Sequence, residues 1–148
     1  MIKKQPPIQY LIGALDTRGF FTIIEQERSD RLNNGCKKKW VNLFSFHTTK
    51  RLTCEFFKEE FGGYIYSEKK GATKHILYRW AIMGKKLTEF CQKVYPHLFL
   101  LKNDCELMME FRETYIITPG YKLTDELIEK RIKLAAEFST QYYSHKTF

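Results

Sequence analysis

The sequence predicts one α+β domain in which a four-stranded antiparallel sheet carries helices on one face and leaves the other open. The chain has 148 residues, a length that suits a single domain. Hydrophobic residues make up 43% and aromatic residues 16%, which is enough for a packed core. Two hairpin-like segments alternate with segments of helical periodicity. We expect one domain over residues 1–148, with a core at about 8–115 and a C-terminal helical extension at 116–148.

The first half of the chain predicts a helix, a hairpin and a second helix. Pro6 and Pro7 are favoured just before a helix, and Gly19 would end it as a C-cap glycine. The next segment is rich in aromatic and β-branched residues, and a turn with an Asn-Asn-Gly tip at 33–35 would join it to a second strand. The expected elements lie at 8–16, 20–28, 38–47 and 50–61.

The second half predicts another hairpin and three helices. Gly71 lies in its turn, and Pro96 would halt the helix that follows. Apolar residues then recur at roughly helical spacing from 97 to 115, and Thr124 is suited to begin the final helix as its N-cap. The expected elements lie at 64–68, 74–82, 85–95, 97–115 and 124 to about 143.

The charge of the chain indicates a polyanionic partner. Lys and Arg number 25 against 17 Asp and Glu, which leaves a formal charge of +8. A domain this basic commonly meets nucleic acid or an anionic membrane surface. No segment approaches the roughly 20 apolar residues of a membrane span, and the N-terminus lacks an apolar secretory core. We therefore expect a nucleic acid, not a membrane, as the partner.

The cysteines and histidines do not form a metal-binding pattern. The four cysteines are separated in sequence, and the four histidines are scattered. A structural zinc site normally shows paired ligands at short spacing. Three of the cysteines lie in apolar-patterned helices, so we expect reduced core residues and a reducing compartment: Cys54, Cys91 and Cys105.

Several segments resemble one known family. Residues 11–19, which read LIGALDTRG, resemble a divergent LAGLIDADG motif. Downstream segments resemble further parts of the same family in the same order: FGG at 61–63, YRWAIMG at 78–84, PHLFLLK at 96–102 and CELMMEF at 105–111. The resemblance covers roughly residues 8–115. The element order expected above agrees with the family's αββαββα core, although that order was reached without the motif.

The resemblance is to the LAGLIDADG homing endonucleases, and it implies both a fold and an activity. The fold is a saddle-shaped sheet that reads the major groove of double-stranded DNA. The motif helix packs against a second copy, and chains with one motif form homodimers on near-palindromic targets. The last acidic residue of the motif binds a divalent cation such as Mg²⁺, which drives cleavage. Family genes occur in phage, mitochondrial and chloroplast introns, which leaves the compartment open.

The chain departs from this pattern at the eighth position of the motif, where Arg18 replaces the acid. Mg²⁺ requires oxygen ligands, which a guanidinium lacks. Our leading hypothesis is a homodimer that binds double-stranded DNA with lost or reduced cleavage. One alternative is an active Mg²⁺-dependent endonuclease with Asp16 as metal ligand and Asp16 and Lys102 as catalytic residues. Another is an intron maturase that binds structured RNA.

Candidate contact residues follow from strand alternation together with the resemblance. Arg18 is suited to contact phosphates, and Lys37, Lys38 and Lys39 form a phosphate patch or a solvated turn. If Trp80 belongs to the core, its neighbour Arg79 and also His75 face outward. The first strand is expected to contact DNA, or simply to end in solvent, through Thr22, Ile24, Gln26 and Arg28. The resemblance places the dimer interface at Leu11, Gly13, Ala14 and Thr17. Alternatively, Gly13 allows tight packing within a single chain.

Overall fold

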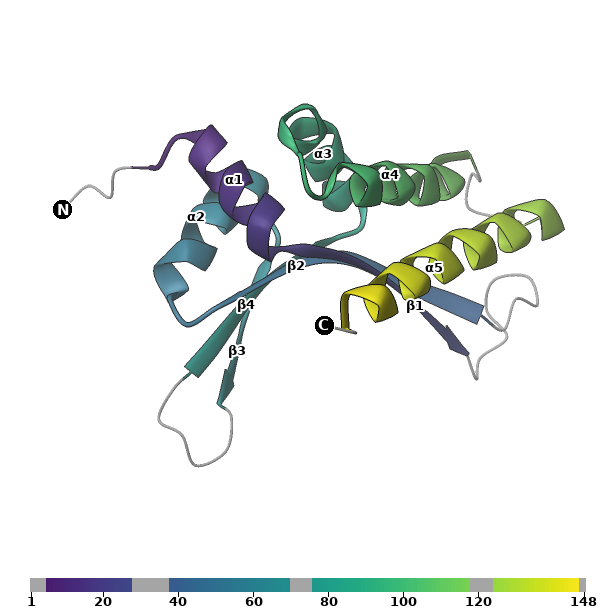
Figure 1. Cartoon of the computed structure of the whole chain (residues 1–148), viewed down its shortest axis with the longest axis horizontal. Coiled ribbons are helices and arrows are strands. Elements are labelled where there is room, and N and C mark those ends of the chain that lie inside the picture. The colour runs from purple at the N-terminus through teal and green to yellow at the C-terminus, as the bar shows by residue number, and fades with distance from the viewer. Residues whose placement is uncertain (1–4, 28–37, 70–75, 118–123, 147–148) are drawn as a thin grey trace.

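The computed structural model describes residues 5–27, 38–69, 76–117 and 124–146, without the side chains of 38, 116, 117 and 139–146. The predicted order of helices and strands is confirmed (Figure 1). The elements are α1 (Ile8–Arg18), β1 (Phe20–Glu27), β2 (Lys38–Thr48), α2 (Arg51–Phe61), β3 (Tyr64–Lys69), β4 (Ile76–Met83), α3 (Lys85–Val94), the short 3-10 helix η1 (Tyr95–His97), α4 (Lys102–Ile117) and α5 (Asp125–Lys146).

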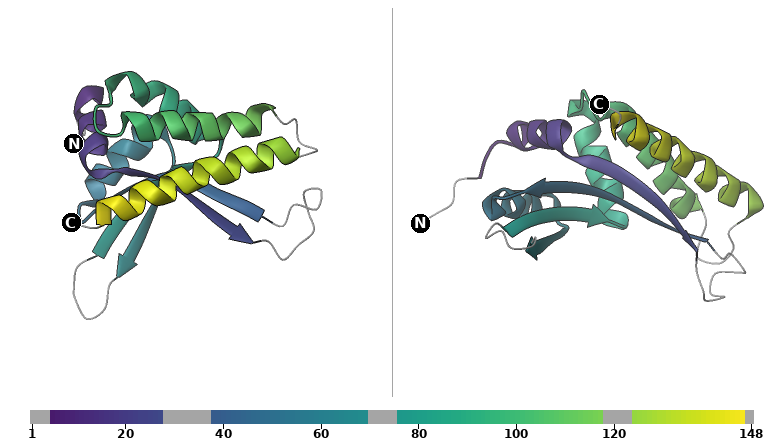
Figure 2. Two further views of the ribbon diagram at one scale, coloured as in Figure 1. Left: turned by 45° about the vertical axis from the view of Figure 1, so that its right-hand side comes forward. Right: turned by 60° about the horizontal axis from the view of Figure 1, so that its bottom comes forward.

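The strands form one antiparallel sheet in the order β1-β2-β4-β3. The helices lie on one side of this curved sheet, and the described elements leave the opposite face open (Figure 2). The predicted α+β architecture is therefore confirmed. None of the described helices combines the length and apolar character that a membrane crossing requires.

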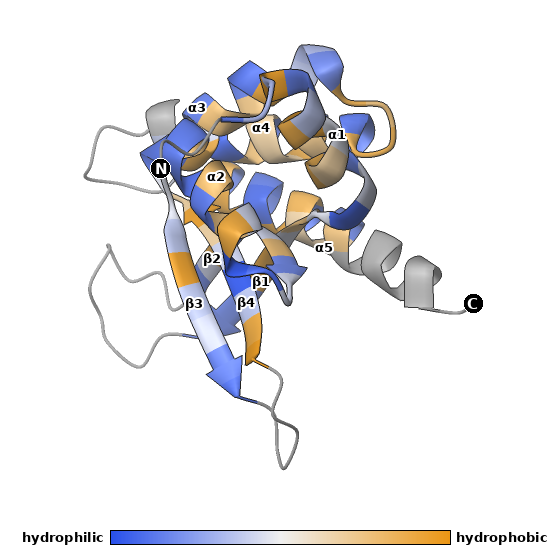
Figure 3. Ribbon diagram, turned by 90° about the vertical axis from the view of Figure 1, so that its left-hand side faces the viewer, coloured by the Kyte–Doolittle hydropathy of each residue, from blue (hydrophilic) through white to orange (hydrophobic). Residues whose placement is uncertain are grey.

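The core lies between the sheet and the helices, where hydrophobic residues gather (Figure 3). Trp80 is fully buried, as predicted, and its ring centroid lies 5.3 Å from that of Phe57 and 5.7 Å from that of Phe90. Its indole N–H donates to the Gly62 carbonyl at 2.8 Å. Gly63 has a positive φ of 91°, and a Cβ there would lie 2.6 Å from the Ala81 carbonyl oxygen. The turn before β3 therefore needs glycine for both backbone conformation and space.

The three helical cysteines are buried and free, as predicted. Burial raises the pKa of the Cys54 thiol to about 11. A thiol with such a pKa stays protonated at neutral pH and is a poor nucleophile. These cysteines therefore serve as core residues, while Cys36 lies outside the described residues.

Gly19 ends α1, but for a reason other than the predicted C-cap conformation. Its φ of −84° and ψ of 170° are extended, whereas a C-cap glycine adopts a left-handed conformation. A Cβ at this position would lie 2.2 Å from Cζ of Phe44 and 2.8 Å from the Leu15 carbonyl oxygen. Glycine is required here because the Phe44 ring approaches the backbone, which is a long-range constraint.

The predicted helix over 97–115 begins later than expected. Tyr95–His97 forms a 3-10 turn, residues 98–101 are non-helical, and α4 starts at Lys102. The backbone N–H groups of Phe99, Leu100 and Leu101 donate to Asp16 and are thereby diverted from helical pairing. Helical spacing alone could not reveal this competition, because Asp16 lies more than 80 positions away in sequence.

The C-terminal helix α5 packs on α4 and β1 and contributes Leu134, Ala135 and Phe138 to the common core. Thr124 caps it as predicted, since its hydroxyl accepts from the Leu127 N–H at 3.3 Å. Arg131 is only 4% exposed, and its Nε donates to the Thr114 hydroxyl at 2.9 Å. The described part of the extension therefore shares one core with the sheet.

Candidate nucleic-acid interface

The first strand has the predicted phase. Phe21 and Ile23 are buried under the helices. Their alternating neighbours Thr22, Ile24 and Gln26 therefore lie on the open face of the sheet. Arg28 falls outside the described residues. Among the predicted contacts of this strand, the structure places three on the same open surface.

The other strands complete the open face through their register. Lys39 of β2 pairs with Gln26, and His47 of β2 pairs with Arg79 of β4. Arg79 in turn pairs with Tyr66 of β3. The outward placement predicted for Arg79 is thus confirmed, whereas His75, Lys37 and the side chain of Lys38 lie outside what the structure describes.

The described part of the open face carries few charged side chains. Its cations are Lys39 and Arg79, and Glu68 adds a carboxylate. Much of the remaining surface is apolar or aromatic, with exposed side chains at Phe20, Ile24, Tyr64, Tyr66 and Met83. Several Lys and Arg residues instead occur in the sequence between strands, at 28–37 and 70–74.

Asp16 lies near the C-terminal end of α1, where it is only 7% exposed. The backbone N–H groups of Phe99 and Leu100 donate to its Oδ2 at 2.9 and 3.1 Å. The Leu101 N–H donates to its Oδ1 at 2.8 Å. Both carboxylate oxygens therefore bind the segment that precedes α4, and Asp16 links α1 to that segment.

Arg18 is exposed, unlike Asp16. Side chains two positions apart on a helix differ by about 200° in direction. One of them can therefore enter the core while the other points outward. The position of Arg18 in the last turn of α1 also places a cation beside the negative end of the helix dipole. The end of α1 therefore displays a guanidinium to solvent and turns its carboxylate inward.

These residues do not fit a Mg²⁺ site at the end of α1. Mg²⁺ prefers carboxylate and water oxygens in near-octahedral geometry, and Arg18 supplies none. The oxygens of Asp16 already accept three backbone hydrogen bonds. Across the described ranges, no three His, Cys, Asp or Glu side chains are grouped closely enough to hold a metal ion.

Lys102 is exposed at the first position of α4, directly after the segment bound by Asp16. Its Nζ lies 5.4 Å from the centroid of the Tyr95 ring. Asp16 of α1 thus binds the residue that directly precedes Lys102, so the structure brings the two predicted catalytic residues near each other. Only Lys102 is exposed, so only Lys102 is available to a phosphate.

The exposed side of α1 contains part of the predicted interface. Gly13 and Thr17 are exposed, and Ala14 is half-buried. Among the described residues, no atom lies within 4 Å of the point where a Cβ on Gly13 would stand, so packing against them does not require this glycine. Leu11 is only 2% exposed and belongs to the core, because it lies on the inward side of the helix. Leu11 is therefore mainly a core residue, although it also lines a groove beside α1.

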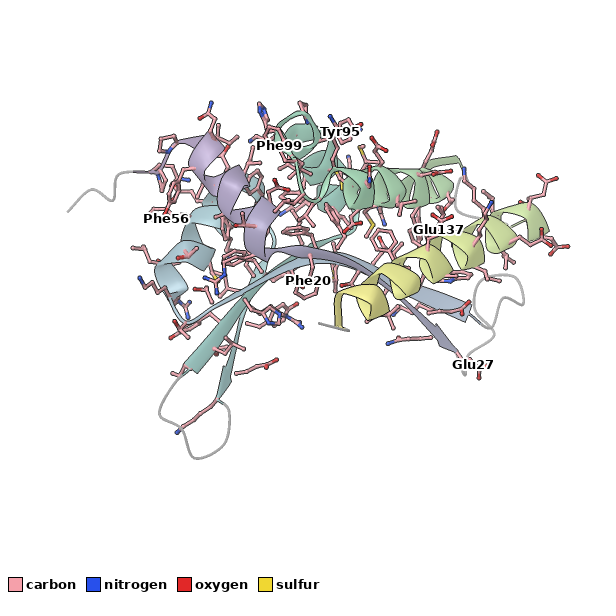
Figure 4. All side chains as sticks on the ribbon, viewed as in Figure 1. Phe20, Glu27, Phe56, Tyr95, Phe99 and Glu137 are labelled. Carbon is pink, nitrogen blue, oxygen red and sulfur yellow. The ribbon has the colours of Figure 1, made fainter. Side chains whose placement is uncertain are left out.

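Sequence patterns missed two apolar features beside α1. Phe99 and Leu100 are 88% and 71% exposed. A groove of about 470 Å³ lies next to α1, lined by Pro6, Pro7, Tyr10, Leu11, Ala14, Thr53, Phe56 and Phe57. Phe56 and Phe99 lie on opposite sides of α1 (Figure 4). Phe99 and Leu100 fall within the helix predicted over 97–115, and only their tertiary placement reveals their exposure.

No protein-family model matches the chain, and no curated protein matches it either. Several solved structures, however, are similar to the chain. An archaeal intron-encoded homing endonuclease in complex with DNA, I-Vdi141I, is 23% identical over 88% of this chain and 80% of its own, with a TM-score of 0.69. The homing endonuclease I-TnaI is 19% identical over 91% of this chain and 89% of its own, with a TM-score of 0.73.

A third similar structure is a longer chain. I-SmaMI, bound to uncleaved DNA in the presence of calcium ions, is 20% identical over 91% of this chain but only 45% of its own, with a TM-score of 0.72. I-SmaMI is described as a LAGLIDADG homing endonuclease. The likeness spans nearly all of the present chain in each case. The chain therefore has the fold of the LAGLIDADG homing endonucleases.

Proposed function

We propose that this protein binds double-stranded DNA as a homodimer through the open face of its sheet, with cleavage lost or reduced. Two structures of the same fold, I-Vdi141I and I-SmaMI, were solved with DNA. The major groove is about 12 Å wide and admits a two-stranded β-ribbon. The open face offers Thr22, Gln26, Lys39 and Arg79 to such a ligand, and the chain has a net charge of +8.

The end of α1 is the observation that supports lost or reduced cleavage. Metal-assisted hydrolysis needs a cation that activates water and stabilises the leaving oxygen. Arg18 contributes charge but no ligand oxygen, and Asp16 binds three backbone N–H groups of a neighbouring segment. In an active enzyme with Asp16 as metal ligand, these two oxygens would have to serve both the metal and the three N–H groups. Arg18 is instead suited to contact phosphates, since it is exposed and permanently charged.

The surface around α1 supports self-association. Exposed apolar side chains as large as Phe99 and Leu100 on neighbouring positions commonly mark an interface. Gly13 allows close approach of another helix, because no described atom of the same chain lies within 4 Å of where its Cβ would be. The present chain aligns with only 45% of I-SmaMI, which is therefore about twice as long. A second copy of the present chain would supply a comparable length.

Two-fold symmetry gives this interface a specific form. Suppose that the α1 helices of two copies face each other across a two-fold axis. The 180° rotation then places each side of α1 in one copy opposite the other side of α1 in the second copy. The 98–101 segment of one copy then lies opposite the groove of the other. Phe99 or Leu100 of each chain would fill the groove lined by Tyr10, Ala14 and Phe56 of its partner. The contact would be reciprocal, as an isologous interface requires.

A second candidate function is binding of structured RNA. Exposed aromatic side chains on an open antiparallel sheet are suited to stack on unpaired bases. Tyr64 and Tyr66 are exposed on β3 in this way, and Phe20 is exposed at the start of β1. Duplex DNA would use the same surface through its groove, so the two ligands would compete for it.

The proposed function can be tested by selecting bound duplexes from a random DNA library and then assaying binding and cleavage of the enriched site. We expect salt-dependent binding, no efficient double-strand cleavage with Mg²⁺ or Mn²⁺, and a weaker affinity for Arg18→Ala. Efficient cutting by the purified protein would contradict lost or reduced cleavage. Binding that is insensitive to salt, or a preference for structured RNA over every duplex, would contradict the DNA-binding proposal itself.

A further inference from the structure

A row of planar side chains crosses the open face, with one member from each strand. The row runs from Phe20 on β1 through His47 on β2 and Arg79 on β4 to Tyr66 on β3. The Phe20 and His47 ring centroids are 5.5 Å apart, and the Arg79 guanidinium carbon lies 4.8 Å from the centroid of the Tyr66 ring. His47 and Arg79 occupy directly opposed positions in the β2–β4 register. Arg79 therefore stands between an imidazole and a phenol ring.

The guanidinium of Arg79 is held in place but has no hydrogen-bond acceptor among the described residues. Its Nε is buried without a partner. The residue as a whole is half-buried, and its terminal nitrogens are not among the buried atoms that lack partners. Stacking on Tyr66 restrains the plane of the guanidinium, while the donors at its edge stay open to a ligand. A restrained side chain loses less conformational entropy on binding than a mobile one.

From this geometry we propose that Arg79 is a guanine-reading residue and that Tyr66 positions it. This inference rests on the proposed DNA binding and adds a specificity to it. A planar fork of N–H donors matches the O6 and N7 acceptors of guanine in the major groove, which is the commonest specific arginine contact with DNA. Lysine cannot reproduce this fork, because its ammonium is a point charge without a plane.

Lys39 provides a matched contrast on the same face. It is exposed at the far end of β2, where it pairs with Gln26. The described residues give Lys39 no aromatic ring to restrain its ammonium, in contrast to Arg79 over Tyr66. A mobile, exposed ammonium is suited to a phosphate contact, which stabilises the complex without reading sequence. The two cations of the described open face are therefore expected to have separable roles.

The experiment compares the base preferences of full-length variants, selected on a randomised duplex library and then measured on single-base variants of the enriched site. Wild type should prefer guanine at one position of each half-site, by roughly 5- to 150-fold over other bases. Arg79→Ala should lose that preference alone and keep the preferences at other positions, while Arg79→Lys should weaken it. Tyr66→Leu should weaken the same preference. Lys39→Ala should lower affinity on all sequences and reduce the salt slope by about 1, with the guanine preference unchanged.

The outcomes separate this inference from the proposed function. If Arg79→Ala binds duplexes with the wild-type base preferences, guanine reading is overturned while DNA binding stands. Equal weakening on all sequences would likewise overturn it, because that result describes a phosphate contact. If wild type binds no duplex, the proposed function fails and this inference fails with it. Thermal unfolding of each variant confirms that the compared proteins are folded.

Discussion

Each side of the sheet contains an arginine stacked on a tyrosine. Among the described residues, only one of these two arginines has hydrogen-bond acceptors. On the helix-covered side, the Arg131 guanidinium carbon lies 3.9 Å from the Tyr115 ring centroid, and its nitrogens donate to the Thr114 hydroxyl and carbonyl. On the open side, the Arg79 guanidinium carbon lies 4.8 Å from the Tyr66 ring centroid, and its buried Nε has no partner among the described residues. The same residue pair therefore stabilises the fold in one place and is available to a ligand in the other.

The difference follows from burial. A guanidinium that is 4% exposed must find its hydrogen bonds inside the protein, since an unsatisfied buried charge is costly. A half-buried guanidinium can leave its edge to solvent until a ligand arrives. Stability measurements should therefore distinguish the two arginines as clearly as binding measurements do.

The largest expected effect is on Arg131. Replacement by Ala should lower the free energy of unfolding by about 3 kcal/mol, because it leaves the buried Thr114 hydroxyl without this donor and opens space beside Trp40 and Tyr115. Arg79→Ala is the matched control, with an expected loss below about 1 kcal/mol. Urea denaturation followed by circular dichroism measures both. Equal losses for the two variants would remove the contrast between the two sides of the sheet.

A smaller loss is expected at Asp16. Asp16→Ala removes the acceptor of three backbone N–H groups, and we expect about 2 kcal/mol of destabilisation because water can replace part of this bonding. Glu113→Gln, on the exposed side of α4, should change stability by less than about 0.5 kcal/mol. Denaturant titration compares them. A fully stable Asp16→Ala protein would indicate that this carboxylate is free for other chemistry.

The exposed segment before α4 should control self-association. Phe99→Asp should weaken the homodimer roughly 10-fold, or about 1.4 kcal/mol, because the charge cannot be accommodated in an apolar groove. Sedimentation equilibrium measures the dissociation constant. Ile76→Asp, at the start of β4, replaces another exposed apolar residue and should leave that constant unchanged. A monomeric wild type, or a Phe99→Asp dimer as tight as wild type, would contradict the proposed interface.

A separate prediction concerns reactivity, at the thiol of Cys54 on the covered side. Burial raises its pKa from 9.0 to about 11, so its thiolate fraction at pH 8 should be roughly 100-fold below that of the unfolded chain. Because the folded pKa is the higher one, the associated stability is present below pH 9 and is lost as pH rises through about 11. Alkylation at pH 8, read by mass spectrometry of the Cys54 peptide, should be slow in buffer and fast in urea. Equal rates would place Cys54 outside the core.

Local patterning predicted the strands better than it predicted the helix ends. The phase of β1 followed from the alternation of Phe21 and Ile23 with polar neighbours, and the burial of Trp80 followed from its large apolar area. The start of α4 was placed five residues too early, at 97 in place of Lys102. Periodicity cannot detect a distant acceptor such as Asp16, which competes for the N–H groups of residues 99–101.

The candidate site was predicted in part for the same reason. Thr22, Ile24, Gln26, Lys39 and Arg79 lie on the open face because strand alternation is a local property. Leu11 was assigned to the interface but lies in the core, and the exposure of Phe99 and Leu100 was not anticipated. Which side of a short helix or apolar run becomes buried depends on its neighbours in space, so sequence alone does not decide it.

Two conclusions about this protein therefore differ in origin. The α+β architecture and the substitution of Arg18 at the motif acid could be read from residue order, because side-chain periodicity and motif spacing are local. The roles of Asp16, Arg79 and Arg131 depended on tertiary structure. Each is a charged side chain whose function follows from which partners the fold brings within hydrogen-bonding distance. Long-range packing supplies partners to Asp16 and Arg131 and leaves the edge of Arg79 open.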